Sequence, residues 1–110
     1  DRIAGVIKAG AGTEEVLEAA DVVHERGFTV YDDVVHGASQ LPPILRTRKT
    51  SRGTPPNFRF ETDMCLVIQP NVATEDALRG VQFGEMMRVT DSGLVKMHNC
   101  PRELIVCRNA

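Results

Sequence analysis

The sequence lacks an excess of charge of either sign and has no long apolar run. Its 110 residues include 13 Lys and Arg against 15 Asp and Glu, a formal net charge of −2. This balance gives no reason to expect nucleic acid or an anionic membrane as a partner. No stretch approaches the roughly 18 to 20 apolar residues of a membrane span, and no apolar core of a signal peptide is present. We therefore expect a soluble, cytoplasmic globular protein.

Cysteine is scarce and has no metal-binding spacing. Cys65, Cys100 and Cys107 are odd in number and form no C-x-x-C pair. This pattern argues against a disulfide framework and against a structural zinc site. Free cysteines behave as small apolar side chains, so we expect three buried thiols.

The length predicts one domain over residues 1–110. Ile3, Val6 and Ile7 have the spacing of the last turns of an amphipathic helix, so we expect a domain truncated at its N-terminus. The apolar run of residues 101–107 resembles a natural C-terminal end.

A helix is predicted to start near Thr13, which stands at the position of an N-cap. Glu14 and Glu15 in the first turn complement the helix dipole. The apolar residues that follow recur at the spacing of one buried helix face, and Gly27 is placed to end the helix in a left-handed conformation. These apolar residues are Val16, Leu17, Ala20 and Val23.

Strands are predicted over the remainder of the chain. Residues 28–35 are rich in β-branched and aromatic side chains, with Asp32 and Asp33 as a point of interruption. Residues 64–69 form a continuous apolar run, and residues 81–89 alternate between apolar and other side chains. Residues 91–93 are typical of a hairpin turn. The sequence thus predicts an α+β fold, an antiparallel sheet with helices on one face.

Residues 34–60 form a basic, proline-punctuated loop with two interpretations. Arg46 and its basic neighbours can clamp a carboxylate or phosphate of a ligand, because guanidinium groups bind such anions with two hydrogen bonds. Alternatively, the loop is solvated and balances the acidic helix of residues 14–25.

Three motifs resemble the pita-bread family of prolidase, aminopeptidase P, methionine aminopeptidase and creatinase. The first is Val35-His36-Gly37, which is similar to the Gly-His-Gly that presents an imidazole to the metal. The other two are Ile68-Gln69-Pro70 and Gly84-Glu85, which resemble the Ile-Glu-Pro and Glu-Asp strands. The resemblance covers nearly the whole chain and implies the C-terminal half of a pita-bread fold.

The metal ligands of the family are substituted at the matching positions. The resemblance places His36 on the His ligand, Gln69 on the first Glu and Gly84 on the second. An amide and a glycine supply no anionic oxygen for a pair of hard cations, so we expect no metal and no other cofactor. Glu85 is no simple replacement, because moving one residue along a strand turns the side chain to the opposite face.

Three functions remain open at this point. The chain resembles a fragment of a creatinase or Xaa-Pro peptidase-like protein that has lost its dinuclear metal site, so that metal-dependent peptidase activity is not expected of this chain alone. A second reading is a metal-free C–N hydrolase, as in creatinase, with His36 as catalytic base. A third is a non-catalytic binding or dimerisation module, in which His36 is an ordinary hydrogen-bonded residue.

A small-molecule or peptide ligand is expected to contact Gln69, Glu85 and Arg46, which can recognise an amide, guanidinium or anionic group. Half of a two-part fold exposes the surface that its other half covers. We therefore expect the chain to form a homo-oligomer or to pack against a missing N-terminal half.

Overall fold

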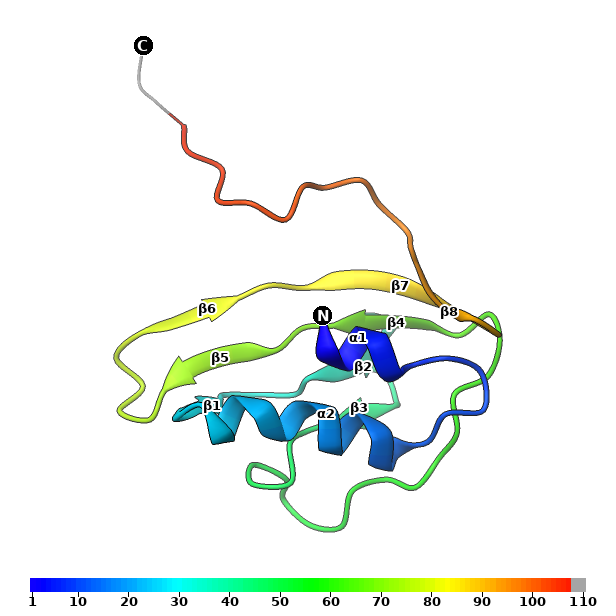
Figure 1. Cartoon of the computed structure of the whole chain (residues 1–110), viewed down its shortest axis with the longest axis horizontal. Helices are drawn as coiled ribbons and strands as arrows, with labels where there is room; N and C mark the ends of the chain where they lie inside the picture. The colour runs from blue at the N-terminus through cyan, green and yellow to red at the C-terminus, as the bar shows by residue number, and fades with distance from the viewer. Residues whose placement is uncertain (108–110) are drawn as a thin grey trace.

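Two helices lie against one face of an antiparallel sheet in the computed structural model, which describes residues 1–107 (Figure 1). Helix α1 spans Arg2–Val6 and helix α2 spans Thr13–Glu25. The apolar side chains of both helices face the sheet: Ile3, Ile7, Val16 and Ala20 are buried in the same core cluster as the strand residues. The predicted α+β class, with helices on one face, is confirmed.

The N-cap of helix α2 lies one residue earlier than the sequence predicted. The N-cap is Gly12, whose N–H donates to the Glu15 carboxylate at 3.1 Å. Thr13 is the first helical residue, and its hydroxyl donates instead to the carbonyl of Pro56 at 2.6 Å. The expected left-handed glycine follows the helix, with Gly27 at φ +79°. Thr13 therefore ties the helix to a distant loop rather than capping it.

The strands form two antiparallel sheets. The five-stranded sheet has the order β3-β2-β4-β7-β8, and the three-stranded sheet has the order β1-β5-β6. The strands are β1 Phe28–Val30, β2 Val35–Gly37, β3 Ile44–Leu45, β4 Cys65–Ile68, β5 Asn71–Thr74, β6 Gly80–Gln82, β7 Glu85–Thr90 and β8 Gly93–Lys96. A short 3-10 turn, η1, covers Ala38–Gln40.

The two sheets are separated by interruptions in three chain segments, which together we call the strand break. The segments 31–34, 69–70 and 83–84 each interrupt what would otherwise be one long strand. On one side of the break Val35 pairs with Ile68, which pairs with Glu85; on the other, Asn71 pairs with Gln82. Figure 1 shows the three interruptions side by side. The interruption after β1 was predicted, whereas the one inside residues 81–89 was not.

The core lies between the helices and the five-stranded sheet. Its fully covered side chains include Phe60, Leu66 and Val89. In β7, Glu85, Met87 and Val89 are buried, as the alternation predicted, whereas Val81 and Phe83 are exposed at 67% and 42%. All three cysteines are exposed, so the prediction of buried thiols is wrong. Each lies at a sheet end or in the extended segment beyond β8, where no second layer covers it.

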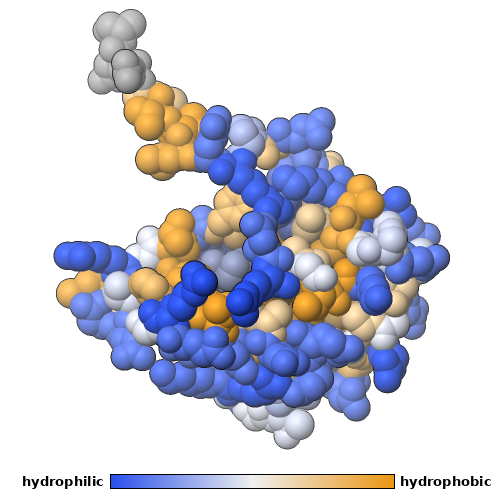
Figure 2. Space-filling model, in the orientation of Figure 1, coloured by the Kyte–Doolittle hydropathy of each residue, from blue (hydrophilic) through white to orange (hydrophobic). Residues whose placement is uncertain are grey.

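Residues 97–107 follow β8 as an extended segment without regular structure. Figures 1 and 2 show this segment running away from the helices and ending in a hydrophobic stretch. Leu104, Ile105 and Val106 are exposed at 89%, 67% and 68%. Within residues 1–107, the helices are too short and too polar to cross a membrane.

Candidate functional site

The register of β2 and β4 indicates that His36 and Gln69 lie on the same face of the sheet. His36 pairs with Val67 across β2 and β4, and Gln69 lies two residues beyond Val67. Side chains two residues apart on a strand share a face, and here that face is the one turned away from the helices. We call it the open face. Of the four predicted site residues, these two share the open face.

Gln69 also fills the space beside Gly84. A Cβ atom at position 84 would lie 2.8 Å from Oε1 of Gln69 and 3.2 Å from its Cγ. These distances are shorter than van der Waals contact, so the two positions are direct neighbours across the open face. The two positions that the resemblance matched to metal-binding carboxylates are therefore adjacent in space.

The imidazole of His36 is held by the backbone of the next residue. The residue is 8% exposed, and its Nδ1 donates to the carbonyl of Gly37 at 2.6 Å. Because a carbonyl only accepts, this bond assigns the proton of a neutral ring to Nδ1 and leaves the lone pair on Nε2. No hydrogen bond to Nε2 comes from the side chains that the structure describes. The ring is thus oriented in a form that can accept a proton or bind a donor.

The close approach of the following loop requires glycine at position 37. A Cβ atom here would lie 2.6 Å from the carbonyl oxygens of both Leu41 and Pro42. The Gly37 N–H donates to Leu41 at 2.7 Å and to Pro43 at 3.0 Å. Both neighbours are backbone atoms, so only glycine fits beside His36.

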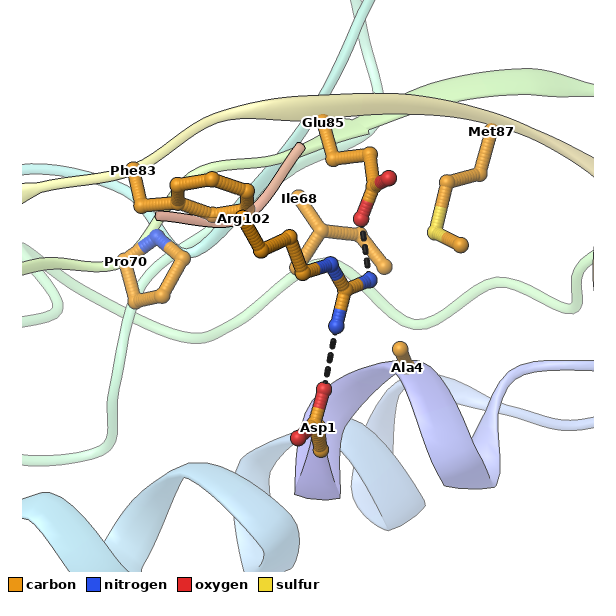
Figure 3. Close-up of a pocket in the computed structure, with 8 residues that line it drawn as sticks. All are labelled: Asp1, Ala4, Ile68, Pro70, Phe83, Glu85, Met87 and Arg102. Carbon is orange, nitrogen blue, oxygen red and sulfur yellow. Dashed lines mark hydrogen bonds and ion pairs between the residues drawn. The ribbon is translucent and has the colours of Figure 1, made fainter. Parts of the chain in front are cut away.

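Glu85 lies on the opposite, helix-covered face. It lines a pocket of about 290 Å³ together with Asp1, Ala4, Ile68, Pro70, Phe83, Met87 and Arg102 (Figure 3). Its register partner is Ile68, whereas Gln69 is one residue further along and points the other way. Glu85 is therefore not brought together with His36 and Gln69, although all were predicted as site residues.

The Glu85 carboxylate is buried and paired with two cations. Its side chain is 2% exposed, Arg102 bonds to Oε2, and Lys96 Nζ lies 2.8 Å from Oε1. The Lys96 contact is an ion pair without hydrogen-bond geometry. Burial disfavours the charged form, but Lys96 and Arg102 outweigh burial, so the pKa of Glu85 is lowered. Glu85 is ionised at neutral pH and holds the chain beyond β8.

Arg102 joins three parts of the chain at this pocket. Besides Glu85, it bonds to the Asp1 carboxylate, and its guanidinium lies 5.7 Å from the ring centre of Phe83. Figure 3 shows the side chain reaching between the strand and helix α1. Sequence reasoning missed Arg102 and Lys96, because nothing local to either residue indicates a partner at position 85.

Asp33 is a second buried carboxyl group, located in the strand break. It is 6% exposed, and burial raises its pKa. Asp32 raises this pKa further, whereas the charges of His36 and Arg46 lower it. Asp33 thus resists ionisation close to the imidazole of His36.

The basic loop is tied to acidic residues of the same chain. Arg46 donates to Asp32 at 2.7 Å, and Arg48 bonds to both Glu14 and Asp21 of helix α2. These contacts match the interpretation of the loop as a counterpart of the acidic helix. A ligand anion would have to compete with Asp32 for Arg46.

Cation-binding groups do not cluster on either face. Among the described residues, no three side chains of His, Cys, Asp or Glu gather closely enough to hold a metal ion. On the open face the two predicted site residues carry one imidazole and one amide, and each can form hydrogen bonds.

Comparisons with known proteins give similarity in structure alone. No family model matches the chain, and no curated protein matches its sequence. Dipeptidase PepE from Mycobacterium ulcerans superposes with a TM-score of 0.74 at 19% identity, over 94% of this chain and 28% of that chain. X-Pro aminopeptidase from Thermotoga maritima MSB8 superposes with a TM-score of 0.70 at 18% identity, over 93% of this chain and 28% of that chain. Methionine aminopeptidase from Rickettsia prowazekii superposes with a TM-score of 0.61 at 18% identity, over 86% of this chain and 46% of that chain.

The chain therefore spans less than a third of the first two peptidases and less than half of the third. Identities this low support an argument about fold and not about activity. What the chain shares with these peptidases is an α+β fold that corresponds to part of the pita-bread fold.

Proposed function

We propose that the chain forms the C-terminal, ligand-facing part of a pita-bread protein related to Xaa-Pro peptidases and creatinase, with its dinuclear metal site replaced by a neutral binding site. The contact between Gln69 and Gly84 carries this proposal, because a side chain at position 84 would meet Oε1 of Gln69 at 2.8 Å. Two positions that hold carboxylates in the resembling enzymes are adjacent here and carry no charge. His36 lies on the same face.

Electrostatics makes a two-metal site untenable with these residues. Two divalent cations bring four positive charges, which hard oxygen anions normally compensate. Gln69 contributes one neutral carbonyl oxygen, Gly84 contributes no side chain, and the imidazole of His36 contributes no negative charge. The open face is suited instead to hydrogen bonds with a small neutral molecule or a peptide, through the Gln69 amide and Nε2 of His36.

Restoring the carboxylates tests the proposal. The double substitution Gln69→Glu and Gly84→Glu places two anionic groups side by side on the face of His36. We expect the native chain to show no saturable heat with Mn²⁺ in calorimetry. The double variant should bind one Mn²⁺ and gain thermal stability on binding, because the cation relieves the repulsion of the two carboxylates.

The matched control is Gly84→Gln, which adds a neutral side chain of the same size at the same position. It should bind no Mn²⁺ and show no metal-dependent stabilisation. Stoichiometric Mn²⁺ on the native chain, lost on His36→Ala, would show that a metal site is present and that the proposal is wrong.

A second candidate function is a metal-free C–N hydrolase, favoured by the tautomer of His36. The 2.6 Å bond from Nδ1 to the Gly37 carbonyl leaves Nε2 as a proton acceptor. Turnover of Xaa-Pro dipeptides or of creatine in the presence of a chelator, abolished by His36→Ala, would establish this activity. Absence of turnover together with ligand binding would leave the neutral binding site as the function.

A further inference from the structure

The segment 103–106, which we call the docking tail, is apolar and unsupported by the rest of the chain. It consists of Glu103, Leu104, Ile105 and Val106, and the three apolar residues are exposed at 67% or more. Figure 2 shows it as a hydrophobic stretch standing away from the body. Contiguous exposed residues of this kind mark an interaction surface in a soluble protein.

The position of the docking tail is fixed at its root. Arg102 bonds to Glu85 and Asp1 and lies over Phe83, so the residue immediately before the tail is anchored. Beyond Arg102 the chain runs away from both helices (Figure 1). An anchored root and an extended apolar tip present the tail outward, towards another molecule.

An apolar groove of about 570 Å³ lies on the helix-covered side, between the helices and the sheet. We call it the helix groove. Its apolar lining comes from α1, α2 and the strands: Ile3, Val22, Val23, Phe28, Ile68 and Val72. Phe28 is 41% exposed there. The groove is large enough to receive several aliphatic side chains, the kind of residue that the docking tail carries.

The charges at the helix groove complement those of the docking tail. Asp1, Arg2 and Arg26 line the groove. Asp1 is paired with Arg102, so Arg2 and Arg26 are the cations that can meet Glu103, the single charged residue within the tail. An incoming tail can therefore place Leu104, Ile105 and Val106 on the apolar lining while Glu103 meets a guanidinium. A strongly acidic or basic partner would lack this match.

We propose that two copies of the chain associate by placing the docking tail of each in the helix groove of the other. A second copy supplies both members of the complementary pair, so the exchange is reciprocal and closes as a two-fold dimer. The chain's own tail contributes no residue to the lining of its groove. This inference does not rest on the proposed function, because neither surface includes His36, Gln69 or Gly84.

Sedimentation of the full chain under reducing conditions tests the association, since the three exposed cysteines must be kept as thiols. The average mass should rise with concentration towards the dimer, with a dissociation constant on the order of 10 µM for so small an interface. The double substitution Leu104→Ser and Ile105→Ser should leave a monomer at every concentration. Leu78→Ser is the matched control, because Leu78 is 81% exposed outside both surfaces.

Disulfide trapping identifies the occupant of the groove. One chain keeps Cys107 beside the docking tail, with Cys65 and Cys100 replaced by Ser. A second chain has all three cysteines replaced by Ser and carries Val22→Cys in the groove. After mixing and oxidation, a covalent heterodimer is expected, whereas a control chain with Arg52→Cys in place of Val22→Cys should give at least fivefold less.

Each result decides the proposal. Concentration-dependent dimerisation that the tail substitutions abolish, together with the heterodimer at position 22, supports it. It is overturned by a native chain that stays monomeric at high concentration, or by dimers that survive the tail substitutions. It is also overturned if a single chain with both Val22→Cys and Cys107 forms only an internal disulfide, because the tail then occupies its own groove.

Discussion

The two faces of the sheet differ most at the strand break. Ile68 and Glu85 face the helices, whereas their chain neighbours Gln69 and Gly84 face away. On the helix-covered face a buried carboxylate is compensated by Arg102 and Lys96. On the open face the Gln69 amide and the His36 imidazole supply no anionic group. The comparison shows that the buried carboxylate of Glu85 lies on the face where two cations compensate it.

The two faces also differ in what constrains their side chains. The helix-covered face forms the core and anchors the extended segment beyond β8, so substitutions there are expected to cost stability. On the open face the Gln69 side chain limits what position 84 can accommodate. A series of substitutions with successively smaller expected effects can therefore test whether the two faces act independently.

The largest effect is expected at Gly37. Gly37→Ala should lower the free energy of unfolding by about 3 kcal/mol, because its Cβ would meet two carbonyl oxygens at 2.6 Å. Urea denaturation measures the change. Gly5→Ala in α1 is the control, since nothing lies within 4 Å of its Cβ and alanine favours a helix by roughly 0.5–1 kcal/mol. Equal effects at both positions would contradict the close approach beside His36.

A smaller effect is expected from Arg102→Ala on the helix-covered face. The substitution removes one of the two cations that pair with Glu85. It should lower the free energy of unfolding by about 2 kcal/mol at neutral pH. The loss is smaller than it would be if both partners were removed, because Lys96 remains. Arg88→Ala is the control, because its pair with Asp63 is exposed and contributes less than about 1 kcal/mol.

The cost of Arg102→Ala should depend on pH in a defined direction. The folded pKa of Glu85 is lowered, so its ion pairs stabilise the fold above the unfolded pKa of about 4.3. This stabilisation is lost as the pH falls through the folded pKa. Denaturation curves should show a smaller difference in the free energy of unfolding between native chain and variant below pH 4 than at pH 7. A difference that does not change with pH would argue against an ionised Glu85.

The smallest effect is expected from Asp33→Asn. Because burial raises the folded pKa of Asp33, its neutral form contributes stability below the unfolded pKa of about 3.9, and this is lost as the pH rises through the folded value. Asparagine stays neutral, so the variant should be slightly more stable than the native chain at pH 7 and not at pH 4. Asp32→Asn should show no such gain, since Asp32 pairs with Arg46.

Local sequence patterns predicted most of the fold. The three-to-four spacing of Val16, Leu17 and Ala20 predicted helix α2, and the alternation through Glu85, Met87 and Val89 predicted which side of β7 is buried. Strand β5 and the break at Phe83 and Gly84 were not predicted. The break depends on three segments aligning across the sheet, and no single segment encodes that alignment.

The open-face positions were matched to one another only through the family resemblance. That resemblance assigned His36, Gln69 and Gly84 to ligand positions, and no local sequence pattern indicated that Gln69 and position 84 are neighbours. The pairing of Glu85 with Arg102 and Lys96, and that of Arg46 with Asp32, did not follow. Ion pairs between distant residues are decided by tertiary packing, which a reading of local pattern does not contain. The exposure of the cysteines has the same origin.

The aligned strand break has a consequence for substitution at its positions. The backbone there stays tied to the neighbouring segment, because the Gln69 N–H donates to the carbonyl of Val34 at 3.1 Å whatever side chain it carries. Gln69 and Gly84 both sit there, next to intact pairs on β4 and β7. We expect a change of side chain at these two positions to leave the pairing of β4 with β7 in place.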